Sequence, residues 1–307
     1  MRLLTTIIAT AILTTLVTGT AGGQEVEYSR EGADTCLSCH EDETTLALFR
    51  GAHAVPTDPN GPFGHGQLQC EACHGPGGDH AGRVRRGQER PSMPVRFGQD
   101  SATPIVEQNA VCLDCHSADT GFGWHGSDHD MNEVACADCH DSHAADDPVL
   151  MTSTQPEVCF DCHQQQRTQV LKPFAHPIRQ GKMDCSGCHN PHGQTSEWQF
   201  ARQTLNQTCF DCHAEKRGPY LWEHAPVAED CGNCHNPHGS NYPGMLTARG
   251  PMLCQSCHSQ EGHPSVPADS DGLPSGMPSA FILGQNCMNC HTQVHGSNHP
   301  SGSRLMR

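Results

Sequence analysis

The sequence has few of the residues from which a soluble protein usually builds its hydrophobic core. Only 35% of its 307 residues are hydrophobic and 5% are aromatic, whereas it contains 31 glycines and 22 prolines. An ordinary globular domain of this composition buries too little apolar area to offset the entropy lost on folding. We therefore expect the polypeptide to be largely unfolded unless a bound group supplies the missing core.

Positive charge is also scarce. The chain has 18 lysines and arginines against 34 acidic residues, which gives a net charge of -16. This excludes the basic stripe that is expected of a nucleic-acid-binding protein. Arginines are dense only at Arg83, Arg85, Arg86, Arg90 and Arg96. There they could pair with anionic groups of a cofactor, lie in a solvated loop, or form a docking patch for a partner.

Long apolar runs are absent after the first residues. Met1 and Arg2 are followed by an apolar run from Leu3 to Val17 and by the small residues Gly19 to Ala21, which is the order of a secretory signal peptide. We predict a signal peptide over residues 1–21 and a soluble, exported mature chain in the envelope of a Gram-negative bacterium. An uncleaved anchor is the alternative, but the run is short for a membrane span of about 20 residues.

No cysteine is left over for a disulfide bond or a separate zinc site, because all 20 cysteines fall in ten copies of the motif C-x-x-C-H. In this motif the cysteines form thioethers with the vinyl groups of one haem, and the adjacent histidine is the proximal ligand of its iron. A single C-x-x-C pair could instead be a zinc knuckle or a thioredoxin-like redox pair. Ten copies, each with its histidine, favour ten covalently bound haems.

The predicted haem-attaching cysteines are Cys36, Cys39, Cys70, Cys73, Cys112, Cys115, Cys136, Cys139, Cys159, Cys162, Cys185, Cys188, Cys209, Cys212, Cys231, Cys234, Cys254, Cys257, Cys287 and Cys290. The predicted proximal iron ligands are His40, His74, His116, His140, His163, His189, His213, His235, His258 and His291.

The centre of the chain, between residues 159 and 239, contains two copies of one sequence repeat. Each copy holds two motifs, a histidine between them (His176, His224) and a histidine three residues after the second motif (His192, His238). We predict one decahaem domain over 22–307 with two-haem units at about 36–80, 112–143, 159–192, 209–238 and 254–295. Motifs in the middle are 22 to 26 residues apart, so we expect short helices and loops, and we expect a loop or partner contact in the longest gap, 82–109.

Ten of the 13 remaining histidines are needed as second axial ligands if every iron is six-coordinate. His53, His129 and His176 each follow the first proximal histidine of their unit by 13 residues, which favours His53 over His65 and His129 over His125. His295 is favoured over His299 by its position. Methionine is the other common distal ligand, but the methionines are not in register with the motifs. The predicted distal ligands are His53, His80, His129, His143, His176, His192, His224, His238, His263 and His295.

A haem iron with two axial histidines has no open coordination position for a substrate, which argues against an enzyme and favours electron transfer. Three hypotheses about the function remain open. The chain could be a conduit for electrons across a membrane, a soluble periplasmic shuttle to a terminal reductase, or a multihaem reductase with one five-coordinate haem.

Several segments resemble the periplasmic decahaem cytochromes of the MtrA/DmsE family. They are the run 212–226 (Cys-His-Ala-Glu-Lys-Arg-Gly-Pro-Tyr-Leu-Trp-Glu-His-Ala-Pro), the two Cys-His-Asn-Pro-His-Gly segments, and the ending 293–302 (Gln-Val-His-Gly-Ser-Asn-His-Pro-Ser-Gly). The resemblance implies an elongated multihaem cytochrome c of loops and short helices, inserted from the periplasm into an outer-membrane β-barrel of the MtrB type. It also implies an extracellular multihaem cytochrome or terminal reductase as a further partner, and a periplasmic or inner-membrane cytochrome as donor. The family's axial histidines match the ten distal ligands chosen above.

Overall fold

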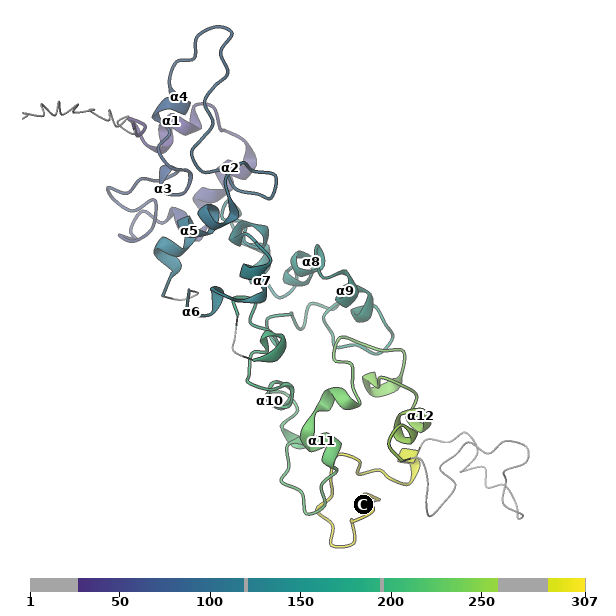
Figure 1. Cartoon of the computed structure of the whole chain (residues 1–307). Coiled ribbons are helices and arrows are strands. Elements are labelled where there is room, and N and C mark those ends of the chain that lie inside the picture. Colours follow the sequence, from purple (N-terminus) through teal and green to yellow (C-terminus); the bar gives the residue numbers. More distant parts are fainter. Residues whose placement is uncertain (1–26, 119–120, 194–195, 259–286, 307) are drawn as a thin grey trace, which may run out of the picture.

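The computed structural model describes residues 27–118, 121–193, 196–258 and 287–306. These residues form an elongated particle in which short helices are joined by loops, with α1 and α4 near one end and the C-terminus near the other (Figure 1). The predicted signal peptide, 1–21, and the distal ligand His263 lie outside the described residues. None of the helices in the described ranges is long and apolar enough to cross a membrane.

The helices are mostly one or two turns long, as the close spacing of the motifs predicts. The α-helices are α1 (Ala33–Leu37), α2 (Glu43–Ala47), α3 (Glu71–His74), α4 (Gly78–Ala81), α5 (Ile105–His116), α6 (Gly121–Trp124), α7 (Asp128–Met131), α8 (Gln155–Phe160), α9 (Gln164–Val170), α10 (Leu205–Phe210), α11 (Ala225–Glu229) and α12 (Gly250–Gln255). The 3-10 helices are η1 (Leu48–Arg50), η2 (Ala52–Ala54), η3 (Cys136–Asp138), η4 (Pro148–Leu150), η5 (Glu197–Gln199), η6 (Ala214–Lys216), η7 (Cys231–Asn233), η8 (Pro243–Met245) and η9 (Cys287–Asn289).

Extended backbone is limited to isolated antiparallel bridges, and the described residues contain no longer strand. Two of these bridges join neighbouring units, Phe174 with Ser240 and Trp222 with Ser297. The fold is therefore the one predicted, a chain of loops and short helices organised around its cysteine motifs.

The longest of the described helices, α5, departs from the expectation that only short helices fit. It has 12 residues and contains the whole third motif. It begins directly after Pro104, whose fixed φ and missing N–H suit the start of a helix. The loop expected over 82–109 therefore ends at residue 104, and the last residues of that stretch are helical.

The core of the described residues is very small. The buried hydrophobic residues are only Ala33, Leu48, Ala54, Trp124, Ala135, Phe160 and Val170, and three of the seven are alanines. Large apolar side chains such as Leu171 and Leu221 are more than half exposed, at 56% and 59%. Packing within the polypeptide therefore contributes little, as the composition predicts, and the apolar faces fit a chain that wraps a large apolar cofactor.

The arginine-rich loop lies between α4 and α5 and extends from the end of the particle that carries α1 and α4 (Figure 1). All five arginines are exposed, and within the described residues none of them forms an ion pair with a carboxylate. Arg90 donates hydrogen bonds to the carbonyls of His80 and Gly82. The loop is thus a cationic surface anchored beside His80.

Candidate haem sites

Each C-x-x-C-H motif forms a single helical turn. Outside α5, the backbone N–H of the proximal histidine donates to the carbonyl of the first cysteine of its motif, as in His163 to Cys159 at 2.9 Å and His189 to Cys185 at 3.0 Å. This i to i+4 bond places both cysteines and the histidine around one turn. The three groups that attach one haem are thereby presented together.

In the second and fourth units, the two motifs are joined by a buried side-chain amide that our sequence reasoning missed. Asn109 accepts from the N–H of Cys136 at 2.8 Å and donates to the carbonyl of Val134 at 3.0 Å. Asn206 accepts from Cys231 at 2.7 Å and donates to Val227 at 3.1 Å. Both asparagines are buried, and each lies three residues before the first cysteine of its unit. This shared Asn-x-x-Cys register is the signal by which they could have been found.

Consecutive motifs are neighbours in space. Within units, the first cysteines of the two motifs lie in contact, in the pairs Cys36 with Cys70, Cys112 with Cys136, Cys159 with Cys185, Cys209 with Cys231 and Cys254 with Cys287. Such a contact raises the pKa of the Cys209 thiol, and burial raises it further. Across unit boundaries, the last cysteine of one unit lies close to a cysteine of the next unit, in the pairs Cys73 with Cys112, Cys139 with Cys159, Cys188 with Cys212 and Cys234 with Cys257. The ten motifs therefore follow one another along the particle in sequence order.

Nine proximal histidines each face one of the predicted distal histidines. The facing pairs are His40 with His80, His116 with His53, His74 with His143, His163 with His129, His140 with His192, His213 with His176, His189 with His238, His258 with His224, and His235 with His295. Their ring centres are 6.0 to 6.3 Å apart. The tenth proximal histidine, His291, lies within the described residues, whereas His263 does not.

This spacing fits an iron between the two rings of a pair. A histidine nitrogen binds a transition metal at about 2 Å, so two imidazoles on opposite sides of one metal have ring centres about 6 Å apart. Among the described residues, no group of three or more His, Cys, Asp or Glu is placed to hold a metal ion. Two opposed histidines leave four equatorial positions, which are those that the nitrogens of a porphyrin occupy. The residues therefore fit haem rather than a bare metal ion.

The paired histidines are also suited to metal binding by their protonation. Burial, with smaller contributions from neighbouring groups, lowers the pKa of His53, His74, His163, His192, His238 and His295. The neutral imidazole is the form that binds a metal.

The pairs cross between units in a reciprocal way. At the junction of the third and fourth units, His176 of the third faces His213 of the fourth, while His238 of the fourth faces His189 of the third. The other three junctions repeat this exchange, with His53 and His143, His129 and His192, and His224 and His295 as the exchanged histidines. Among the nine described pairs, only the first, His40 with His80, comes from within one unit.

Backbone contacts hold three of the four exchanges in place. His176 Nδ1 is 2.8 Å from the carbonyl oxygen of Pro237, the residue before His238, and Phe174 bridges Ser240 just beyond it. Equivalent contacts join His129 to Pro191 at 2.8 Å and His224 to Val294 at 2.9 Å. Because Nδ1 takes part in this hydrogen bond, Nε2 is left available to bind a metal.

At three of the four junctions, a glycine follows the histidine that the later unit contributes. Gly239 follows His238 with φ +138°, and a Cβ at this position would lie 2.4 Å from the carbonyl oxygen of Gln169 and 2.9 Å from the Cβ of Ala175. Gly193 and Gly296 follow His192 and His295 and are equally crowded by the preceding unit. At these three junctions the glycine after the exchanged histidine therefore allows two units to approach closely, whereas Ala144 follows His143 at the first junction.

Replacing Gly239 with alanine is expected to destabilise the holo-protein by about 3 kcal/mol, because the new methyl group adds a backbone clash to the strain of a positive φ. Gly87→Ala is the matched control, because Gly87 also has positive φ (+88°) but has open space around its Cβ position. Urea unfolding followed by circular dichroism measures both. Equal midpoints for the two variants would contradict the tight junction.

The three remaining histidines are not part of any described pair. His65 and His299 are exposed. The side chain of His125 is 72% exposed, with its Nδ1 3.9 Å from Asp130. His299 Nδ1 accepts hydrogen bonds from the Ser301 backbone and hydroxyl at 3.2 and 2.9 Å. The structure thus brings together the histidines that the spacing favours and leaves these three on the surface.

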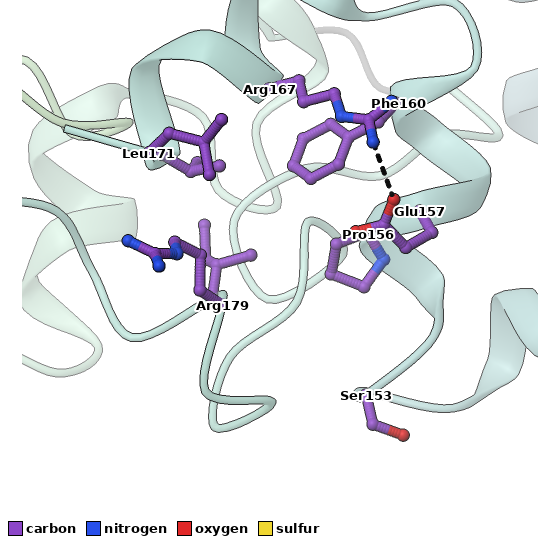
Figure 2. Close-up of a pocket in the computed structure, with 9 residues that line it drawn as sticks. Ser153, Pro156, Glu157, Phe160, Arg167, Leu171 and Arg179 are labelled. Carbon is purple, nitrogen blue, oxygen red and sulfur yellow. Dashed lines mark ion pairs between the residues drawn. The ribbon is translucent and has the colours of Figure 1, made fainter.

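A hollow between α8 and α9 is not one of these sites. Figure 2 shows it lined by Pro156, Phe160 and Leu171, with Arg167 and Glu157 3.6 Å apart at its rim. None of the predicted cysteine or histidine ligands lines it. The ion pair is exposed, and such pairs contribute little to stability.

Two family models match the chain. The doubled CXXCH motif matches residues 176–218 and 224–263, and the NrfB-like cytochrome c-type protein matches residues 70–156. The chain is also 48% identical to the multihaem cytochrome MtrA of Shewanella baltica over 286 residues, which are 92% of this chain and 84% of that protein. The chain belongs to the MtrA family of multihaem cytochromes. This confirms the resemblance and the fold class predicted from the sequence.

The NrfB cytochromes are more distant relatives of this MtrA-family chain. It is 32% identical to the cytochrome c-type protein NrfB of Escherichia coli over 161 residues, which are 50% of the chain and 78% of that protein. The NrfB of Haemophilus influenzae is 26% identical over 161 residues, 47% of the chain and 70% of that protein. As a multihaem c-type cytochrome, the MtrA-family chain binds haem c and is an electron-transfer protein rather than an enzyme.

Proposed function

We propose that this protein carries electrons along its length through ten haems, each held between two histidines. The observation that carries the proposal is the row of nine histidine pairs, which follow the motifs in sequence order and share one spacing. When bound, the haems supply a series of one-electron sites close enough to exchange electrons with their neighbours. The polypeptide fixes the order, spacing and orientation of these sites.

The proposed axial ligands of the irons follow from the facing histidine pairs. Each described pair supplies both axial ligands of one iron, with its proximal member from C-x-x-C-H and its distal member from the adjoining unit, except in the first pair. His291 is proposed to take His263 of its own unit as distal ligand, which closes the last site as His80 closes the first. The two-haem units are then parts of one domain over 22–307, because an excised unit would lose the ligands that its neighbours supply.

The same pairs favour electron transfer over substrate chemistry at the irons. Catalysis at a haem requires an open position or a ligand that leaves, and both members of a pair are anchored here. The proximal histidine is held by its own helical turn, and the distal histidine is held by hydrogen bonds such as that of His176 to Pro237 at 2.8 Å.

The most specific form of the proposal is a conduit across the outer membrane. An elongated row (Figure 1) suits insertion into a β-barrel of the MtrB type, whose polar lumen would meet the polar surface of this chain. Family membership supports this form, since the chain is 48% identical to MtrA. We place the protein in the periplasm, where its barrel partner would join it to an extracellular multihaem cytochrome or terminal reductase. The cationic loop beside His80 suits an acidic cytochrome donor from the periplasm or inner membrane.

A membrane-fraction pull-down of the tagged holo-protein tests the conduit. A stoichiometric outer-membrane β-barrel in the eluate is expected. The alternative is a soluble periplasmic shuttle, which predicts the fully loaded protein in the soluble fraction without a barrel. This second result would overturn the conduit while leaving the electron-transfer function in place.

A further inference from the structure

The second proximal histidine of each unit shows how the chain orients its iron ligands. In four units, Nδ1 of this histidine contacts a main-chain carbonyl oxygen: His74 contacts Val95 at 3.2 Å, His189 contacts Trp198 at 2.9 Å, His235 contacts Gly244 at 2.7 Å, and His291 contacts Arg304 at 2.7 Å. In the second unit the partner is a carboxylate instead. His140 Nδ1 lies 2.7 Å from Oδ2 of Asp147.

The Asp147 carboxylate is fixed in this position by its own backbone contacts. It caps η4, where its Oδ1 accepts from the N–H of Val149 at 3.3 Å. The same oxygen accepts from the N–H of Asp141 at 3.3 Å, so that Oδ2 points to His140. The side chain of Asp147 is only 15% exposed and the imidazole of His140 is 33% exposed. Solvent therefore screens this contact only partly.

A carboxylate acts on an iron-bound histidine more strongly than a carbonyl does. Its full negative charge draws the Nδ1 proton and makes the imidazole a more basic ligand. A more basic ligand and a nearby negative charge both favour the ferric state over the ferrous state, so both lower the reduction potential. A neutral carbonyl, as at His189 and His235, provides the hydrogen bond without the charge.

We propose that Asp147 is a positioning residue that lowers the reduction potential of the haem held between His140 and His192. This inference rests on the ligand assignment under the proposed function. Of the five haem sites formed by the second motif of each unit, the least readily reduced would then be the fourth site of the row. An electron passing along the chain would then meet an uphill step there, between the first three sites and the last six.

Asp147→Asn tests the proposal, because asparagine is also a good helix cap and keeps an oxygen acceptor but removes the charge. Asp146→Asn is the matched control: Asp146 is the exposed neighbour in sequence, and its replacement removes the same charge. Both holo-proteins are titrated spectroelectrochemically, after the pyridine haemochrome assay and the visible spectrum establish ten low-spin haems. We expect one step at the negative end of the Asp147→Asn titration to move to a more positive potential, whereas Asp146→Asn overlays the wild type.

The outcomes separate this inference from the proposed function. Ten low-spin haems with an unchanged Asp147→Asn titration would overturn the role of Asp147 and leave the ligand pairs intact. Equal shifts in the two variants would attribute the effect to general surface charge and also overturn it. Asp147→Glu, which keeps the charge, is the control for a variant that attaches too few haems. If Asp147→Asn and Asp147→Ser attach fewer than ten haems and Asp147→Glu attaches ten, Asp147 acts in folding and the proposal fails. A wild-type spectrum with high-spin iron would contradict the proposed function itself.

Discussion

Replacing His176 with alanine should convert one low-spin iron per chain into a five-coordinate, high-spin iron. His176 faces His213 at 6.3 Å, and its Nδ1 is already engaged with Pro237, so its loss removes the distal ligand of one site and leaves the proximal ligand in place. The open position should bind one equivalent of carbon monoxide in the reduced protein. Added imidazole should restore the low-spin spectrum of the oxidised protein.

His125→Ala is the control for this variant. His125 is 72% exposed and belongs to no described pair, so its loss should leave every iron low-spin. Magnetic circular dichroism and carbon monoxide titration measure both variants. If His176→Ala remains fully low-spin without added ligand, or if His125→Ala opens a site, the pairing of His176 with His213 is wrong.

The chain without attached haem is expected to be unfolded. Its described residues bury only seven hydrophobic side chains, and three of these are alanines, which is far too little apolar burial to offset the conformational entropy of folding. Producing the chain in a host without the cytochrome c maturation system provides this form. Its radius of gyration should rise toward the value of about 60 Å for an unfolded chain of this length.

The haem-loaded protein in the same buffer is the reference for this measurement. It should show a cooperative thermal transition by circular dichroism, whereas the haem-free chain should show none. A cooperative transition and dispersed amide signals in the haem-free chain would mean that the polypeptide folds on its own. The central role of the cofactor in the core would then be wrong.

Local features of the sites could be predicted from the sequence because they depend on short spacing. The turn that joins Cys159 to His163 is formed by five consecutive residues. The choice of His129 over His125 follows from its spacing to the preceding proximal histidine, which recurs in other units. The expectation of short helices and loops also follows from the spacing of motifs. Among the described helices only α5 exceeded it, because the chain before Cys112 has no preceding motif close enough to limit its length.

The partner of each distal histidine could not be predicted, because it is set by contacts between units. His238 follows His235 by three residues, yet the structure places it against His189 of the preceding unit. The contacts that decide this, such as the approach of Gly239 to Gln169, join residues about 70 positions apart. Asp147 was missed for the same reason, since a polar residue outside a repeated pattern acquires its role only from what folds against it.

The closed row of histidine pairs is tested most directly by the spin state and ligation of every iron in the wild-type holo-protein, measured together with the haem-to-chain ratio. Near-infrared magnetic circular dichroism distinguishes bis-histidine from histidine–methionine ligation and from high-spin iron, and the pyridine haemochrome assay counts haems against protein mass. We predict ten haems per chain, all low-spin and all bis-histidine. A methionine-ligated or high-spin fraction, or fewer than ten haems, would contradict the closed row of histidine pairs.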